Sequence, residues 1–171
     1  MNTQATYISL FAQFVEEAVE RSRLNLNPRL ASEEAIANAR RWATGGLAEE
    51  WVDRVQAGET LDLSGVVKAY RDTADRLFFI GVKLPAVQSS AVAAAGWLAS
   101  TMAEHLERGS VDRFVWNLGF VGRLAIDVFD RTGVDGNERL RALLATHDLV
   151  LPDRHAADIM VMEMKREHGV P

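Results

Sequence analysis

Cysteine is absent from the 171 residues of this sequence, and lysine is scarce. Without cysteine, disulfides, thiolate catalysis and cysteine-based zinc or iron–sulfur sites are excluded. Of the 19 basic residues, only Lys68, Lys83 and Lys165 are lysines. A strong preference for arginine is common in GC-rich bacterial coding sequences, so it indicates a bacterial or phage source before it indicates a function.

The sequence also lacks an apolar run long enough to span a membrane. The most continuous stretch, Ala91 to Ala99, is short and rich in alanine, whereas a spanning helix needs roughly 20 predominantly apolar residues. The amino-terminal residues MNTQATYISL contain neither a basic region nor a cleavable apolar core, so no secretory signal is expected. These absences predict a soluble, cytoplasmic protein without membrane contact.

An excess of basic residues is missing as well, because 24 acidic residues outnumber the basic ones and the net charge is −5. Binding nucleic acid regardless of its sequence requires a cationic face that releases counterions. Only a local arginine patch would therefore permit nucleic-acid contact. The content of 48% apolar and 25% charged residues is typical of one folded domain, and we expect residues 1–171 to form it.

What the sequence does contain is helical periodicity, with no convincing strand alternation. Apolar residues spaced for one helix face predict helices near residues 6–23, 33–55, 65–82, 85–108, 111–131, 138–146 and 153–167. Ser32 is the expected N-cap of the second helix, which Gly45-Gly46 should break or kink. The expected fold is all-α, a single-domain bundle of six or seven helices with the apolar helix 111–131 at its centre.

Two apolar segments predict close packing. LFFIG, residues 77–81, is apolar on all sides and is expected to be buried. The alanine-rich segment Ser89–Ser100 has small side chains that would let another backbone approach closely.

A His–Asp dipeptide lies in RALLATHDLVLPDR, residues 141–154, and resembles the way HD-type phosphohydrolases present two metal ligands. In that family such residues hold one or two metal ions that activate water. The resemblance implies a metal-dependent phosphohydrolase with the site His105, His147, Asp148 and Asp158. The alternative is that the dipeptide only ends a helix, and we favour it because the family's small residue after the pair is replaced by Leu149-Val150.

VKLPAVQSSAVAAAGWLAS, residues 82–100, resembles a helix pair found in small helical subunits of some RNA-guided interference complexes. The resemblance implies a subunit of a nucleoprotein complex. Such a subunit would gather arginines on one face and offer an aromatic side chain for stacking on a base. The residues expected to do so are Arg21, Arg23, Arg40, Arg41 and Trp42.

Motifs of catalysis are absent: the sequence has no HExxH, GxSxG, phosphate-binding loop or dinucleotide fingerprint. We therefore expect no catalytic residue and no cofactor, and we favour a non-catalytic helical protein that binds another protein or itself. It would act as an adaptor, a regulator or a subunit of a bacterial or phage assembly. Adaptable Met-rich surfaces and aromatic anchors are favoured at interfaces. The expected contacts are the alanine-rich face and Ile159, Met160, Met162, Met164 and Trp97.

Overall fold

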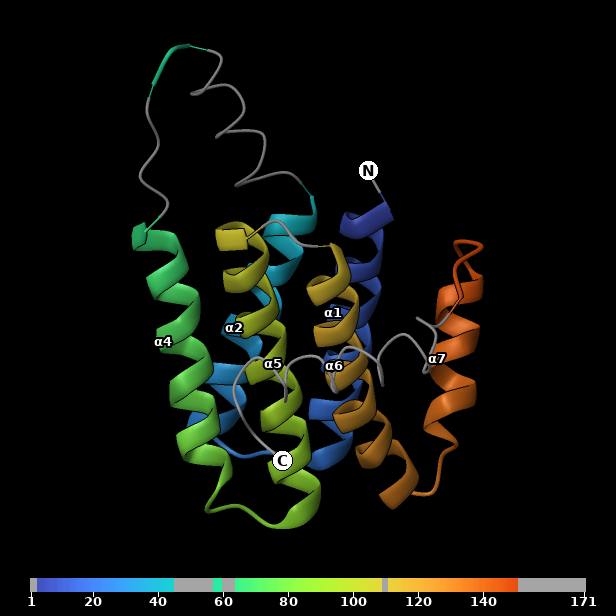
Figure 1. The fold of residues 1–171 in the computed structure, drawn as a ribbon. Coiled ribbons are helices and arrows are strands. Elements are labelled where there is room, and N and C mark those ends of the chain that lie inside the picture. Colours follow the sequence, from blue (N-terminus) through green and yellow to red (C-terminus); the bar gives the residue numbers. More distant parts are fainter. Residues whose placement is uncertain (1–2, 45–56, 60–63, 109–110, 151–171) are drawn as a thin grey trace, which may run out of the picture.

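The computed structural model describes residues 3–44, 57–59, 64–108 and 111–150, and these residues form six helices and no strand. Helices that follow one another in the chain run in opposite directions (Figure 1). The bundle consists of α1 (Thr3–Ser22), α2 (Asn27–Ala43), α4 (Ser64–Gly81), α5 (Ala86–Arg108), α6 (Val111–Arg131) and α7 (Gly136–Ala145). The predicted all-α bundle is confirmed, and the helix predicted near 153–167 lies outside the described residues.

The helices are arranged in two layers (Figure 1). One layer holds α1 and α2, and the other holds α4, α5 and α6, with α7 packed against α6 and α1. Helix α5 contacts α4, α6, α2 and α1, whereas α6, which the sequence places at the centre, contacts α5, α1 and α7. The two helices therefore share the core. The turns α1–α2, α4–α5 and α6–α7 all lie at one end of the bundle, here called the turn end.

Helix α6 shows why the long helices are predictable. Leu118, Val121, Ala125 and Val128 recur at helical spacing, and all four are fully buried. Phe129, at the end of this stripe, stacks on a phenylalanine of α1 with 4.8 Å between the ring centroids. Burial of this apolar stripe stabilises the helix more than its intrinsic propensity does.

The alanine-rich segment packs inside the protein. Ala91, Ala95 and Ala99 of α5 are buried, and a Cβ atom added at Gly96 would lie 2.8 Å from the Phe78 ring of α4. The Phe78 ring therefore packs directly on the backbone of α5 at Gly96, so the neighbour that comes close here is a side chain and not the expected backbone. The expectation that this face binds a partner is wrong for its apolar side chains, because the helices of the bundle already cover them.

Helix α2 begins five residues before the predicted N-cap. Pro28 lies in its first turn, where the missing N–H group costs nothing. Ser32 is buried inside the helix, and its hydroxyl donates to the Pro28 carbonyl at 2.7 Å. The prediction that Ser32 caps the helix is wrong, because a hydroxyl that bonds back by one turn also suits a helix interior.

Candidate interaction surface

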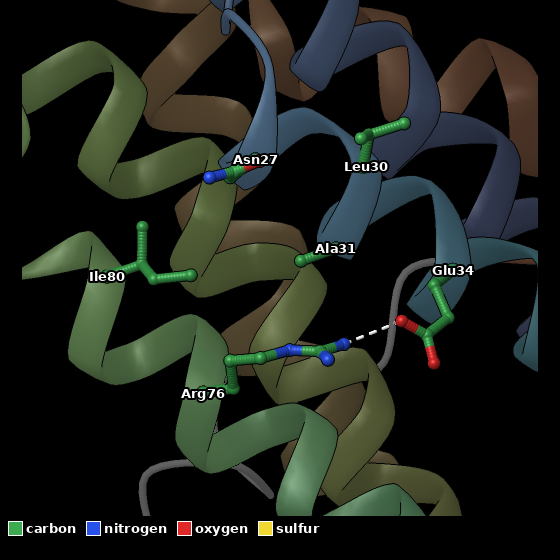
Figure 2. Close-up of a pocket in the computed structure, with 6 residues that line it drawn as sticks. All are labelled: Asn27, Leu30, Ala31, Glu34, Arg76 and Ile80. Atoms are coloured by element: carbon green, nitrogen blue, oxygen red, sulfur yellow. Dashed lines mark hydrogen bonds and ion pairs between the residues drawn. The ribbon is translucent and has the colours of Figure 1, made fainter.

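A pocket of about 380 Å³ lies between α2 and α4 near the turn end. Figure 2 shows the six side chains around it, with the Arg76–Glu34 ion pair on one side. Apolar and polar side chains of both helices line it: Asn27, Leu30, Ala31, Glu34, Arg76 and Ile80. We call these six residues the α2–α4 groove.

Large apolar side chains next to the groove face solvent. Leu30 on its wall is 62% exposed, and Leu26, just before α2, is 80% exposed. At the end of α4, Phe79 is 68% and Val82 is 82% exposed. Single exposed apolar residues are ordinary, but several of them beside a concave site are typical of a binding surface.

The backbone at Leu26 is strained as well. Its φ of 54° and ψ of −124° lie in a region that glycine occupies readily and L-residues avoid. Such a conformation costs on the order of 1–3 kcal/mol. The Leu26 side chain is largely exposed, so it gains little burial on folding that would offset the backbone strain.

The polar groups of the groove are mostly satisfied within the protein. Arg76 donates to Glu34 at 2.6 Å, and Arg29 donates to Glu33 at 2.9 Å. These pairs are half exposed, so each contributes little to stability. Lys83, in contrast, places its ammonium group 4.7 Å from the centroid of the Phe79 ring. No carboxylate of the described residues pairs with it.

Sequence reasoning missed this surface. The prediction that residues 77–81 are buried holds for Leu77 and Gly81, which are buried, and fails for Phe79. The described helices that pack on α4 are α5 and α2, so no other helix of the described residues covers its outward side. The apolar run itself could have indicated this surface. A helix that buries one face needs apolar residues on that face only, so apolar residues on its other sides are available to reach solvent.

The partner-binding residues expected from the sequence are only partly visible. Ile159, Met160, Met162 and Met164 lie outside the described residues. Trp97 is half-buried in an aromatic cluster between α4, α5 and α6. Its ring stacks on that of Phe120 at 5.0 Å and meets Phe78 at 5.8 Å and Trp116 at 6.0 Å edge to face. Trp97 therefore contributes to packing within the bundle.

The arginines expected to form a patch lie at opposite ends of the molecule. Arg21 and Arg23 follow one another at the end of α1, and Arg40 and Arg41 lie at the end of the antiparallel α2 (Figure 1). From its start at Asn27 to Arg40, α2 spans about 20 Å at the helical rise of about 1.5 Å per residue. The structure does not bring the four arginines together.

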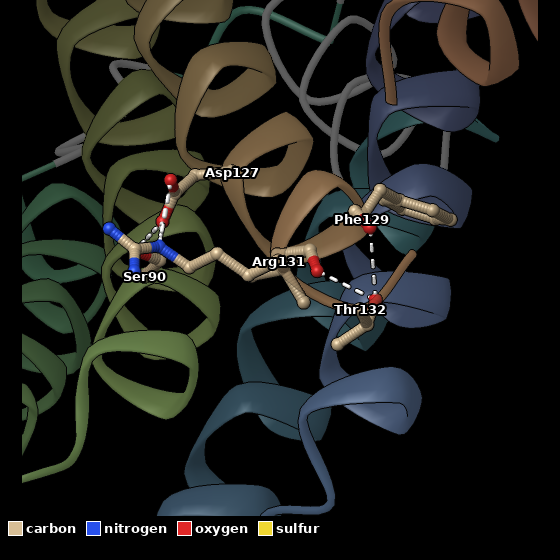
Figure 3. A network of polar contacts seen from close by, with 6 residues as sticks. Ser90, Asp127, Phe129, Arg131 and Thr132 are labelled. Atoms are coloured by element: carbon tan, nitrogen blue, oxygen red, sulfur yellow. Dashed lines mark hydrogen bonds and ion pairs between the residues drawn. The ribbon is translucent and has the colours of Figure 1, made fainter. Parts of the chain in front are cut away.

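Two of these arginines also have partners inside the bundle. Arg21 donates to the hydroxyl and the carbonyl of Thr132, both at 2.9 Å, and its guanidinium lies 5.3 Å from the centroid of the Phe129 ring. Figure 3 shows Thr132 beside the contacts of Asp127 with Arg131 and Ser90. Arg40 donates to Glu16 of α1. Both side chains are therefore engaged in contacts between helices.

The remaining two residues of the expected nucleic-acid face, Arg41 and Trp42, differ in their exposure to solvent. Arg41 is exposed, whereas Trp42 is buried and packs edge to face on His105. The ring centroids of Trp42 and His105 lie 5.2 Å apart. A buried indole offers no face for stacking on a base.

The residues of the expected metal site are not assembled either. His105 lies on α5, and His147 and Asp148 follow α7, which packs on α6 and α1. Among the residues that the structure describes, no three His, Asp or Glu side chains form a group that could hold a metal ion. Asp158 lies outside that part of the chain. His147 and Asp148 follow the end of α7, and Asp148 adopts a left-handed backbone conformation there, with a φ of 55°.

His105 occupies an aromatic environment. Its ring lies between Trp42 of α2 and Phe114 of α6, with centroid distances of 5.2 and 5.1 Å. Its buried Nδ1 atom has no hydrogen-bond partner in the part of the chain that the structure describes. Burial lowers the pKa of His105 from its ordinary value, because desolvation disfavours the charged imidazolium.

Comparisons with known proteins identify no relative: no protein-family model, no curated protein and no solved structure matches the chain. In the described part of the chain, no helix combines the length and the apolar character needed to cross a membrane.

Proposed function

We propose that this protein is a non-catalytic helical protein that works by binding another protein, as an adaptor, a regulator or a subunit of a bacterial or phage assembly. The observation that carries the proposal is the exposure of Leu26, Leu30, Phe79 and Val82 around the α2–α4 groove. Their exposure is unfavourable in the free protein, and removing such side chains from water contributes roughly 25 cal/mol per Å². A bound partner supplies that burial.

A second candidate places the same surface inside a nucleoprotein complex, such as an RNA-guided interference complex. Its support is the resemblance of residues 82–100, which form the α4–α5 turn and the first part of α5. In this candidate the chain meets neighbouring protein subunits through the groove, because the arginines at the ends of α1 and α2 are far apart.

Affinity purification of the tagged protein from its source cells tests both candidates. The eluted proteins are identified by mass spectrometry, and the ratio of absorbance at 260 and 280 nm is recorded. A stoichiometric protein partner without nucleic acid supports the first candidate, and a partner with nucleic acid supports the second. A protein that elutes alone at every salt concentration contradicts both.

A further inference from the structure

We infer that the partner presents an amphipathic helix with an acidic residue next to its apolar face, and that this helix lies along the α2–α4 groove. The inference rests on the proposed function and adds the chemistry of the partner. Four features carry it: the shape of the groove, its walls, the apolar side chains beside it and the charge at its end.

The shape of the groove favours a helix as the occupant. The described residues form no strand, so in this part of the chain no sheet edge is available for an added strand. Two helices with a pocket between them are suited to a third helix, which packs into grooves at an interaxial distance of roughly 8–10 Å. The pocket of about 380 Å³ has room for the apolar side chains that such a helix inserts.

The spacing of the apolar residues agrees with this arrangement. Leu26 precedes α2 and is four positions from Leu30, and Val82 follows α4 and is three positions from Phe79, so each pair is close along the chain at the turn end. A helix along the groove would meet these two rows with apolar residues at positions i, i+3 or i+4, and i+7.

The charge at the turn end specifies the acidic residue. Glu33 and Glu34 are engaged by Arg29 and Arg76, so they offer little attraction to a cationic partner. Lys83, which follows Val82, has no carboxylate partner among the described residues. It is an exposed cation on a chain whose net charge is −5.

Arg23 adds a second cation three residues before Leu26, and it is exposed as well. Asp75 lies one turn before Phe79, towards the middle of α4. Glu20, exposed at the end of α1, adds to the negative charges that act on Arg29, so Lys83 is the cation of the turn end that a carboxylate of the partner would complement.

Site-specific photo-crosslinking in the source cells tests this inference. In the full chain, p-benzoylphenylalanine replaces Leu30, or Ala142 on the exposed side of α7 as the control position. The peptides joined to the protein are sequenced by mass spectrometry. We expect the Leu30 position, and not the control, to capture a peptide of another protein with apolar residues at helical spacing and Asp or Glu within one turn of them.

The charge is tested in the same experiment. Lys83→Glu is expected to lower the yield of the Leu30 crosslink about fivefold, and Lys83→Arg to preserve it, because an exposed charge pair contributes up to about 1 kcal/mol. Circular dichroism and the urea midpoint confirm that both variants fold. An unchanged crosslink yield with Lys83→Glu would overturn the inference that the partner carries an acidic residue next to its apolar face.

The other outcomes separate this inference from the proposed function. A crosslink from Leu30 to a second copy of this chain, to nucleic acid, to lipid or to a peptide without the helical pattern overturns the inference. Crosslinks to another protein from Ala142 alone overturn it while leaving the proposed function in place. The absence of protein crosslinks at both positions overturns the two together.

Discussion

At the scale of single residues, Leu26 combines two unfavourable properties. Its backbone has a φ of 54° and a ψ of −124°, and its side chain is largely exposed. Neither property helps α2 to begin, since Leu26 forms no side-chain cap hydrogen bond. A glycine at this position would start the helix at a lower cost.

We therefore predict that Leu26→Gly raises the free energy of unfolding by about 1 kcal/mol. Relief of strain, on the order of 1–3 kcal/mol, exceeds the entropy that glycine adds to the unfolded chain, about 0.5–1 kcal/mol. Leu26→Ala is the matched control, because it removes the apolar side chain and keeps the strained Cβ. Urea denaturation of the three proteins measures the effect, and an equal gain in both variants would contradict the strain argument.

His105 makes the stability of the bundle depend on pH. Its pKa is lowered by burial in the folded protein and is about 6.5 in an unfolded chain. Unfolding therefore takes up a proton where the unfolded histidine is protonated and the folded one is neutral. The stabilisation is complete above pH 6.5 and is lost as the pH falls through 6.5 towards the folded pKa.

We expect the free energy of unfolding to fall between pH 7 and pH 5, with a slope below the one-proton limit of about 1.4 kcal/mol per pH unit. His105→Gln should reduce this slope relative to the wild type. His147→Gln, at an exposed position, should leave it in place. The measurement is a series of urea titrations at half-unit pH steps, and equal slopes in all three proteins would exclude His105 as the source.

At the scale of helices, α7 is attached to the bundle by a close backbone approach and an ion pair. A Cβ atom at Gly136 would lie 2.8 Å from both the Cα and the carbonyl oxygen of Ile126. Arg139 donates to Glu17 of α1 at 2.6 Å. Since backbone atoms cannot move aside as a side chain tip can, Gly136 fixes how closely α7 approaches α6.

Gly136→Ala is expected to lower the free energy of unfolding by about 2 kcal/mol, within the range for overpacking a tight contact. Gly65→Ala is the comparison, because no atom lies within 4 Å of a Cβ at that position of α4. There alanine should stabilise the protein by up to about 0.5 kcal/mol, because Gly65 lies in the first turn of α4, where helix propensity counts less than in the interior. Two variants that destabilise equally would show that the approach of α7 to α6 is looser than described.

The helices were predictable from the sequence because their information is local. The expected limits of α6 agree with the structure, since the apolar stripe that predicts them lies within the helix itself. The start of α2 was misjudged, because both Pro28 and Ser32 are suitable first residues and the choice depends on tertiary contacts. Local sequence does not decide between them.

The candidate surface was not predictable in the same way. The exposure of Phe79 depends on which helices pack on α4, and that is a property of the whole bundle. The same applies to Trp42 and His105, which the sequence offered for stacking and metal binding and the fold buries against each other. Sequence patterns name the residue types, but the packing of distant helices decides which of them reach solvent.

At the scale of the whole molecule, the two layers leave the outer sides of α2 and α4 without a covering helix among the described residues. The core is fully formed without Leu30 and Phe79, since both are mostly exposed. Stability and binding should therefore be separable: substitutions on this surface are expected to change the free energy of unfolding by less than about 0.5 kcal/mol.

The most direct test is a quantitative affinity purification with the double variant Leu30→Glu and Phe79→Ser. A second double variant, Ala142→Glu and Ala145→Ser on the exposed side of α7, is the control. The account predicts that wild type and control recover the same partner in equal amounts, and that the groove variant recovers less than about a tenth of it while unfolding at the same urea concentration. Equal recovery by the groove variant would contradict the claim that this surface binds the partner.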